Sequence, residues 1–327
     1  MLSSLLTNTG GVLILDGAQG TELERRGVHL GGSKLWSAQL LIDDPDLIRT
    51  IHLDYLRAGS DVITTFTYQA SIQGFADAGM DARMGATLLN RAVDLAESAR
   101  TAFLDEQRQQ HEQPPPHHQQ RVRPLIAFSS GSYGAYLADG SEFRGDYADS
   151  MTLQQLANFH RDRLEPVRHR TEIDLLAFET VPCLREAEAI LELLRQERYG
   201  KPAWISFSCR DAVHTSHGER FAEQCVPLLA AAAAEGLEVV ATGVNCTAPR
   251  HLLLVCYPNS GEEWDGEHRC WRHLPDDIAE PECFAEAAAE CVYGDPRVSL
   301  MGGCCRTGPE HIRALRRWLQ AQQHCQQ

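Results

Sequence analysis

Three cysteines stand where the sequence predicts the ends of β-strands. Cys246 follows the apolar run at residues 237–244, and Cys304 and Cys305 follow a second run at 298–301 and two glycines. Glycine permits the backbone torsions of the tight turn that adjacent ligands require. Two strands that each finish in cysteine can bring three thiolates to one end of a sheet. Three thiolates and one open position are the layout of a catalytic zinc site.

Other polar residues occupy equivalent places in the sequence. Asp16 ends the run at residues 12–15, Glu179 ends the run at 173–178, and Thr65 lies at the end of a third run. One such residue alone would more often be a helix cap. Six side chains at strand ends, three of them cysteines, instead favour a common site at the carboxyl ends of the strands.

The elements that would position these residues alternate along the chain. Strand-like runs are predicted at residues 12–15, 61–66, 124–128, 173–178, 203–208, 237–244, 252–256 and 298–301. Helical patterns are predicted at residues 45–58, 86–104, 153–168, 184–198, 221–235 and 309–319. This alternation predicts an α/β fold with a parallel sheet, and eight strands predict a (β/α)8 TIM barrel. We therefore expect residues 1–327 to form a single domain.

One sector of the expected barrel is short. Only about six residues separate Cys246 from the apolar segment at 252–256, whereas a parallel crossover needs about a dozen or more. The βα sector after strand six is therefore predicted to be shortened. Strand seven should be short, displaced or replaced by a loop, and the Ala-rich helix at 221–235 should be less covered on one side.

A low-complexity segment lies at residues 109–120 and is rich in proline, histidine and glutamine. Such a composition predicts a disordered loop and not a metal site.

Composition excludes several classes of partner. The chain has 30 Lys and Arg against 45 Asp and Glu, a net charge of −15, which argues against nucleic acid and anionic membranes. No run of 18 apolar residues indicates a membrane span. Eleven cysteines in a chain of this length, without a signal peptide at its start, do not form the pattern of a disulfide framework. We expect reduced thiols and a cytoplasmic protein.

The motifs together resemble the zinc-dependent homocysteine S-methyltransferases, in the subgroup that uses S-methylmethionine or S-adenosylmethionine as methyl donor. The matching segments, in the order of the family, are residues 16–23, 35–38, 65–71, 133–142, 179–180, 243–246, 257–262 and 302–307. The chain differs from the family in the short stretch after residue 246, in Ser132 where the family usually has proline, and in the insertion near residue 115.

The resemblance implies the residues of a site. Cys246, Cys304 and Cys305 would bind one Zn²⁺. Asp16 and Glu179 would hold the amino group of homocysteine, and the backbone around Gly17 and Thr65 would meet its carboxylate.

The resemblance also implies a reaction. The methyl group would pass from the sulfonium donor to the homocysteine thiolate and give methionine, which places the protein in methionine biosynthesis. The partners would be these small molecules, with no nucleic acid and no membrane, and the sequence leaves the oligomeric state open.

Two other functions deserve comparison with this one. The shortened sector would also suit a catalytically impaired zinc-binding barrel variant that lacks the sixth crossover helix. A barrel lyase or aldolase would need a Schiff-base lysine at a strand end. Lys34 and Lys201 are the only lysines, and neither follows an apolar strand.

Overall fold

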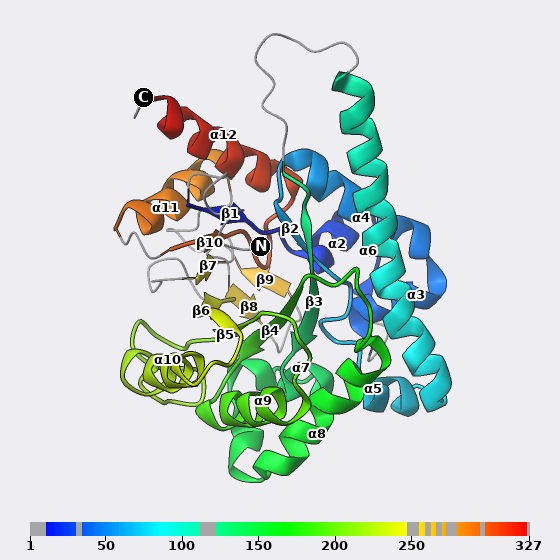
Figure 1. Cartoon of the computed structure of the whole chain (residues 1–327), viewed down its shortest axis with the longest axis vertical. Helices are drawn as coiled ribbons and strands as arrows, with labels where there is room; N and C mark the ends of the chain where they lie inside the picture. The colour runs from blue at the N-terminus through cyan, green and yellow to red at the C-terminus, as the bar shows by residue number, and fades with distance from the viewer. Residues whose placement is uncertain are drawn as a thin grey trace.

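The centre of the fold is a parallel sheet of eight strands, shown in the computed structural model of Figure 1. The structure describes residues 11–30, 35–111, 122–246, 255–258, 263–265, 270–272, 280–294 and 298–325. The strands of the sheet are β1 (Leu13–Ile14), β2 (Val62–Thr64), β3 (Leu125–Gly131), β4 (Leu175–Val181), β5 (Ala203–Phe207), β6 (Val239–Asn245), β7 (Val255–Tyr257) and β10 (Leu300–Met301). A parallel sheet in an α/β chain confirms the predicted fold class at that level.

The strand order is β1-β10-β7-β6-β5-β4-β3-β2, and every neighbouring pair is parallel. The two strands at the ends of this order also meet, because Leu15 and Val62 form a parallel bridge. Pairing between strands therefore continues from the last strand of the order back to the first.

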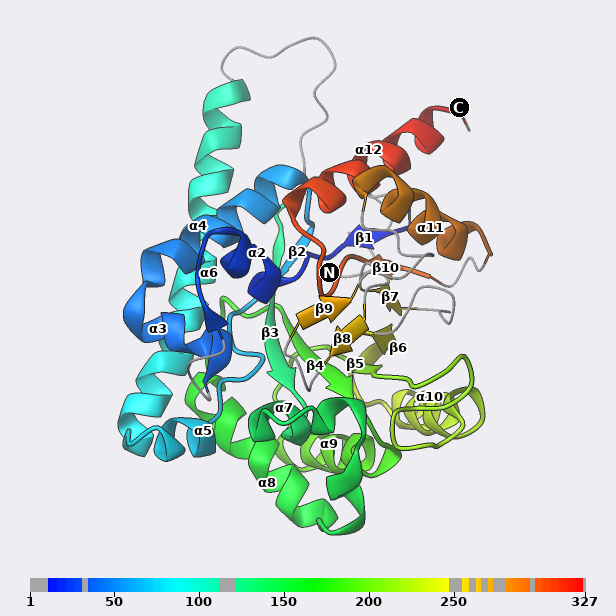
Figure 2. The same ribbon diagram turned by 180° about the vertical axis from the view of Figure 1, so that it is seen from behind.

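Helices lie outside the sheet in both views (Figures 1 and 2). The helices that follow or precede the strands are α2 (Gln19–Arg25), α3 (Leu40–Asp43), α4 (Pro45–Ala58), α5 (Ile72–Asp77), α6 (Ala82–His111), α7 (Tyr133–Leu137), α8 (Leu153–Leu164), α9 (Leu184–Glu197), α10 (Val226–Ala234), α11 (Pro281–Gly294) and α12 (Pro309–Cys325). Short turns of other helix types are η2 (Trp36–Gln39), η3 (Ser141–Phe143), η4 (Asp146–Asp149), η5 (Glu165–Val167) and η6 (Phe221–Cys225), and β8 (Glu263–Asp265) pairs with β9 (Cys270–Arg272).

Local sequence explains where the longer helices begin. The Asp44 carboxylate caps α4 by accepting from the Leu47 N–H at 3.0 Å, and Pro45 occupies the first helical position. Helix α8 begins with a capping box formed by Thr152 and Gln155. Within the described ranges, no helix is both long enough and apolar enough to cross a membrane.

The core has two parts. A large cluster joins the helices to the outer face of the sheet. A second cluster of buried residues comes from strands and strand ends: Leu13, Leu15, Val62, Leu125, Ala127, Leu175, Ala177, Trp204, Tyr257 and Leu300. The inner face of the sheet thus packs against itself, as the alternation of side chains along strands requires.

Only part of the predicted seventh strand lies within the described residues, so its shortening stays a prediction. Strand β7 has three residues, whereas β6 has seven. Cys256 pairs with Val244 and Tyr257 with Asn245, so β7 lies beside the carboxyl end of β6. The connecting residues 247–254 lie outside the described ranges.

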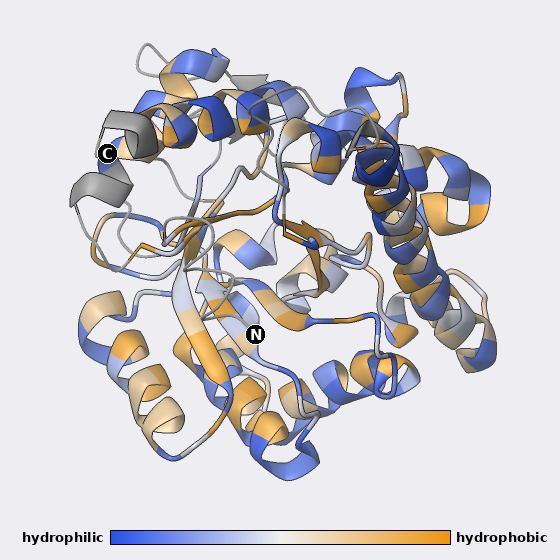
Figure 3. Cartoon of the chain, turned by 45° about the horizontal axis from the view of Figure 1, so that its top comes forward, coloured by the Kyte–Doolittle hydropathy of each residue, from blue (hydrophilic) through white to orange (hydrophobic). Residues whose placement is uncertain are grey.

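Helix α10, in the segment predicted to be less covered on one side, has much of its surface exposed. Helix α10 is apolar throughout, yet only Leu229 and Ala232 are buried in it. Figure 3 shows this helix at the lower left, coloured as largely hydrophobic. Val240, near the start of β6, is 43% exposed. The pairing of β6 with β5 shifts register at this residue, which makes Val240 an extra residue in the strand.

The segment predicted as a loop at 109–120 begins differently from the prediction. Helix α6 continues to His111, so residues 109–111 are helical. Glutamine and histidine can extend a helix that has already formed, and the first proline comes only at position 114. The remainder of the segment, to residue 120, lies outside the described residues.

Candidate metal centre and substrate site

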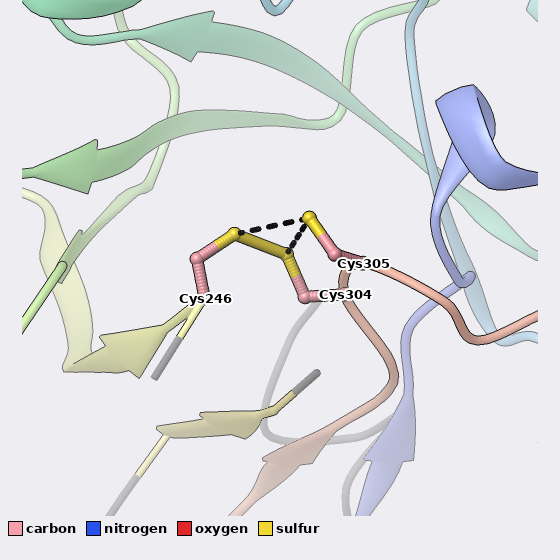
Figure 4. A group of neighbouring side chains, drawn as sticks. All are labelled: Cys246, Cys304 and Cys305. Atoms are coloured by element: carbon pink, nitrogen blue, oxygen red, sulfur yellow. Dashed lines mark hydrogen bonds between the residues drawn. A yellow bond between two sulfur atoms is a disulfide. The ribbon is translucent and has the colours of Figure 1, made fainter. Parts of the chain in front are cut away.

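The three predicted cysteines lie together at the carboxyl ends of two strands (Figure 4). Cys246 directly follows β6, and Cys304 follows β10 after two glycines. The Sγ of Cys305 lies 3.9 Å from that of Cys246 and 4.0 Å from that of Cys304. Cys246 and Cys304 are joined by a disulfide, with their Cα atoms 5.7 Å apart. The two strand ends thus bring these sulfurs together, and the expectation of reduced thiols stays a prediction.

The positions of the sulfurs also fit a metal ion. Tetrahedral ligands at a Zn–S distance of about 2.3 Å are about 3.8 Å apart. The two separations from Cys305 are close to that edge length. In the part of the chain that the structure describes, this trio is the only group of three potential ligands whose atoms all lie within 4.8 Å. In the reduced state, these cysteines could bind a metal ion.

The surroundings of Cys305 disfavour its thiolate form in the absence of a bound cation. Burial raises the pKa of Cys305 to about 12, and the carboxylates of Glu142 and Glu24 add to that shift. A cation among the sulfurs would supply the missing positive charge.

Unusual backbone conformations hold the strand ends. Cys246 has φ +49° and Thr180 has φ +59°, both in the left-handed region. Asn245 ties these ends together, because its Oδ1 accepts from the Thr180 N–H at 2.9 Å and its Nδ2 donates to Thr180 Oγ1 at 2.8 Å. Strained residues of this kind are concentrated at functional sites. The sequence places Asn245 in a motif, but its bridging role was not predicted.

The loop that carries Cys304 is fixed by neighbouring backbone groups. Its N–H donates to the carbonyl of Pro258 at 2.7 Å, and Thr307 Oγ1 donates to its carbonyl at 2.6 Å. Gly17 packs against the same loop, since a Cβ at that position would lie 2.7 Å from the Thr307 carbonyl. Only glycine lets the end of β1 approach the cysteine loop so closely.

Two buried carboxylates lie at the ends of β1 and β4. Asp16 accepts from the Thr64 N–H at 2.8 Å. Glu179 accepts from the Ser129 hydroxyl at 2.6 Å and from the Tyr257 hydroxyl at 3.1 Å. Neither carboxylate forms an ion pair with another described residue.

The environment of this pair favours a cationic ligand. Burial raises the pKa of Asp16 to about 8, to which the charge of Glu179 also contributes. Burial likewise raises the pKa of Glu179. Two buried acids that repel each other are stabilised by a positive group placed between them. An ammonium group has that charge and donates the hydrogen bonds that carboxylates accept.

Thr65 is fully buried, and both its backbone N–H and its hydroxyl form hydrogen bonds with other protein groups. Its N–H donates to the Ala127 carbonyl at 2.9 Å, and its hydroxyl accepts from the Ser129 N–H at 3.0 Å. This residue therefore stabilises the end of β2. Contact between a ligand and the backbone of this segment would involve amides other than that of Thr65.

A buried arginine supports the loop after β2, and no sequence pattern indicated this role. Arg163, on α8, donates to the carbonyls of Thr67, Tyr68, Ala70 and Gly131 at 2.7–2.9 Å. Burial lowers the pKa of Arg163 to about 10. In the sequence this arginine is one of several charged residues in a helical pattern, so only the tertiary structure reveals its partners.

Comparison with known proteins shows the family to which the chain belongs. The family described as homocysteine S-methyltransferase matches residues 13–319. Homocysteine S-methyltransferase 2 of Arabidopsis thaliana is 40% identical over 332 residues, covering 97% of this chain and 96% of its own length. The chain therefore belongs to the homocysteine S-methyltransferase family and is an enzyme.

Solved structures point the same way. The oxidized form of the homocysteine methyltransferase MmuM from Escherichia coli has a TM-score of 0.77 and 38% identity, covering 97% of this chain and 99% of that one. The metallated form of MmuM has a TM-score of 0.76 and 37% identity over the same shares. MmuM thus has both an oxidized and a metallated form.

Proposed function

We propose that this enzyme transfers a methyl group from a sulfonium donor, S-methylmethionine or S-adenosylmethionine, to the thiolate of homocysteine. The observation that carries the proposal is the cysteine trio with metal-ligand spacing at the same strand ends as two buried carboxylates without ion-pair partners. The names of the relatives support homocysteine as the acceptor.

We further propose that the metal is zinc, held by Cys246, Cys304 and Cys305. Thiolates are soft ligands that favour zinc, and three of them leave one tetrahedral position open for a substrate sulfur. A zinc ion bound there would deprotonate the thiol of homocysteine and keep it nucleophilic at neutral pH.

The chain's own residues would supply binding and orientation. Asp16 and Glu179 hold the ammonium group of homocysteine, and the backbone near Gly17 and Thr65 receives its carboxylate. Ser129 and Tyr257 fix the orientation of Glu179 through their hydrogen bonds. Holding the acceptor in one position lowers the barrier, because the two sulfurs must lie in line across one methyl group.

The transfer needs no acid or base from the protein. The bond between the methyl carbon and the donor sulfur breaks, and a bond from that carbon to the homocysteine sulfur forms. The donor sulfur keeps the electron pair and becomes a neutral thioether, while the acceptor becomes methionine.

For the scaffold, we infer a closed (β/α)8 barrel formed by one domain of residues 1–327. The bridge between Leu15 and Val62 and the strand-derived inner core support closure. A cytoplasmic location belongs to the same proposal, since a reducing compartment keeps thiolates available to a metal.

The impaired-variant alternative is not favoured. Strand β7 is short, but it pairs in register with β6 and β10 and brings Tyr257 to Glu179. The shortened sector therefore still contributes to the site.

The decisive experiment is methionine formation from homocysteine by protein that has been reduced and then loaded with Zn²⁺. Each sulfonium donor is supplied separately, with and without a chelator. We expect turnover with at least one donor, loss of turnover with the chelator, and recovery on adding Zn²⁺. Protein that holds one zinc per chain and converts neither donor would refute the proposed function.

A further inference from the structure

A buried carboxylate near the cysteines has no part in the mechanism above. Glu142 lies in η3, in the loop after β3, within a motif to which the sequence assigns no role. It is 9% exposed, and its Oε2 atom is buried without a hydrogen-bond partner among the described residues. An acceptor left in this way is unfavourable unless a ligand supplies a donor.

The backbone holds Glu142 in a fixed place. Its carbonyl accepts from the buried hydroxyl of Ser208 at 2.6 Å. Gly134 packs against it so closely that an added Cβ would lie 2.8 Å from the Cα of Glu142. The preceding residue Ser141 is fixed by its N–H, which donates to Asp139 Oδ1 at 2.9 Å. The carboxylate thus belongs to a packed turn.

Glu142 lies over the carboxyl ends of β4 and β5, at the edge of the sheet that carries the proposed site. Ser208, whose hydroxyl donates to the Glu142 carbonyl, directly follows β5, and its own N–H donates to the carbonyl of Val181 at the end of β4 at 3.1 Å.

The guanidinium of Arg144 pairs with Asp146 at 2.7 Å and with Asp139 at 3.7 Å. Burial raises the pKa of Glu142 to about 7, although the charge of Arg144 acts in the opposite direction. A cationic ligand at this carboxylate would therefore favour its ionised form.

The reaction involves a second amino acid besides homocysteine. Both proposed donors carry an α-ammonium group in addition to the positively charged sulfur. Asp16 and Glu179, at the ends of β1 and β4, are assigned to the acceptor, whereas Glu142 stands on a separate element. Two anchors on different elements would hold the two amino acids apart, with their sulfurs facing each other across the methyl group.

We propose that Glu142 binds the α-ammonium group of the sulfonium methyl donor through the unpartnered Oε2 atom. This inference rests on the proposed function. It adds a specificity-determining residue for the donor, distinct from the pair that holds homocysteine. The ammonium supplies both the hydrogen bond that Oε2 lacks and the positive charge that the buried carboxylate needs.

The test compares Glu142→Gln with the wild-type protein, both loaded with zinc. Calorimetric titration with S-methylmethionine, without homocysteine, should show binding weakened about tenfold or more, because a hydrogen bond to a charged group is lost. The KM for S-methylmethionine should rise by a similar factor, and the KM for homocysteine should stay unchanged.

A matched control separates a direct contact between Glu142 and the ligand from the long-range effect of a negative charge near the site. Glu24, on α2, also raises the pKa of Cys305, but it is exposed. Glu24→Gln removes the same unit of charge and should leave the affinity for S-methylmethionine within about twofold, as expected for a screened surface charge.

A second arm of the test changes the ligand, and its first measurement uses the wild-type protein alone. The S-methylmethionine analogue with hydrogen in place of the α-amino group should bind the wild-type protein about tenfold more weakly, and Glu142→Gln should weaken it no further. If the analogue binds the wild-type protein as tightly as S-methylmethionine does, the proposal is overturned, even if the variant fails to fold. Equal losses for both ligands in the variant would also overturn it, because Glu142 would then sense the sulfonium charge. A raised KM for homocysteine alone would do the same.

The outcomes distinguish this inference from the proposed function. A zinc-loaded wild-type protein that converts no sulfonium refutes the function itself. A wild-type protein that turns over normally but tolerates Glu142→Gln refutes only the role of Glu142.

Discussion

Tyr257 and Glu179 meet across the interior of the sheet, where the tyrosine hydroxyl donates to Glu179 Oε2 at 3.1 Å. Tyr257 belongs to the shortened strand β7, and Glu179 is one of the two carboxylates assigned to the acceptor. The tyrosine hydroxyl also accepts from Trp204 Nε1 at 3.3 Å and contacts the hydroxyl of Ser206. Strand β7 therefore orients a carboxylate that we propose binds the substrate.

Replacing Tyr257 with phenylalanine should impair acceptor binding. A hydrogen bond to a charged group contributes about 1.5–3 kcal/mol, so the KM for homocysteine should rise about tenfold or more. Zinc content should not change, because Tyr257 does not belong to the cysteine trio. Steady-state kinetics and metal analysis on the same preparation measure both quantities.

Tyr199→Phe provides the control for this variant. The hydroxyl of Tyr199 is buried and has no hydrogen-bond partner among the described residues, so its loss should leave the KM unchanged. An unaltered KM for homocysteine in Tyr257→Phe would show that Ser129 alone suffices to orient Glu179.

Removing one sulfur should abolish stable metal binding. Cys304→Ala leaves two of the three ligands, and the affinity for Zn²⁺ should fall by more than the roughly 10–100-fold that loss of an outer-shell partner costs. The exposed Cys283 on α11 serves as control, since Cys283→Ala removes a thiol that is not part of the cluster. Zinc per chain, measured after reduction and dialysis, should be close to one for the control and near zero for Cys304→Ala.

Oxidation should produce the same loss of zinc in the unmodified protein. A disulfide between Cys246 and Cys304 removes two ligands at once. If oxidised protein and Cys304→Ala both retain zinc stoichiometrically, the ion is bound elsewhere.

The sequence predicted those parts of the site that depend on strand ends. Cys246, Cys304, Asp16 and Glu179 each follow an apolar run, and parallel strands place such residues at one edge. The eight predicted strands all appear, although β1 and β10 are only two residues long. Periodicity locates an element reliably, whereas hydrogen-bond pairing sets its ends.

The sequence could not predict the supporting contacts. Asn245 and Thr180 are 65 residues apart, and Arg163 contacts a loop more than 90 residues earlier. Such contacts depend on how loops pack over the strand ends, and single-residue patterns contain no information about that packing. The short helices α5 and α7, which follow β2 and β3, were also missed, because segments of five or six residues show too little periodicity to be recognised.

The raised pKa of Asp16 predicts a dependence of stability on pH in the substrate-free protein. The folded-state pKa, about 8, lies above the ordinary value of 3.8. Its contribution to stability is therefore fully present below about pH 4 and is lost as the pH rises through 8. Asp16→Asn removes this dependence and keeps an oxygen that can accept from the Thr64 N–H.

Denaturant unfolding at pH 5 and at pH 9 measures the effect. The wild-type protein should lose about 1.4 kcal/mol of its free energy of unfolding for each pH unit between pH 5 and the folded-state pKa, and Asp16→Asn should not show this loss. The variant should therefore be more stable, relative to the wild-type protein, at pH 9 than at pH 5. A difference that stays constant between the two pH values would mean that Asp16 is ionised at an ordinary pKa.

Burial along β6 is uneven. The pairing of β6 with β5 shifts register between Val239 and Ala241, so Val240 is an extra residue at an irregularity near the start of the strand. Val244 pairs in regular register with Phe207 near the end of the strand. Val240 is 43% exposed and Val244 is 3% exposed.

Val244→Thr should lower the free energy of unfolding by about 1–3 kcal/mol, because it places a hydroxyl in the core. Val240→Thr should change it by no more than about 0.5 kcal/mol, as is usual for surface positions. Denaturant midpoints of the two variants, compared at equal m-values, provide the measurement. Equal losses for both variants would show that the irregular start of β6 is buried in solution.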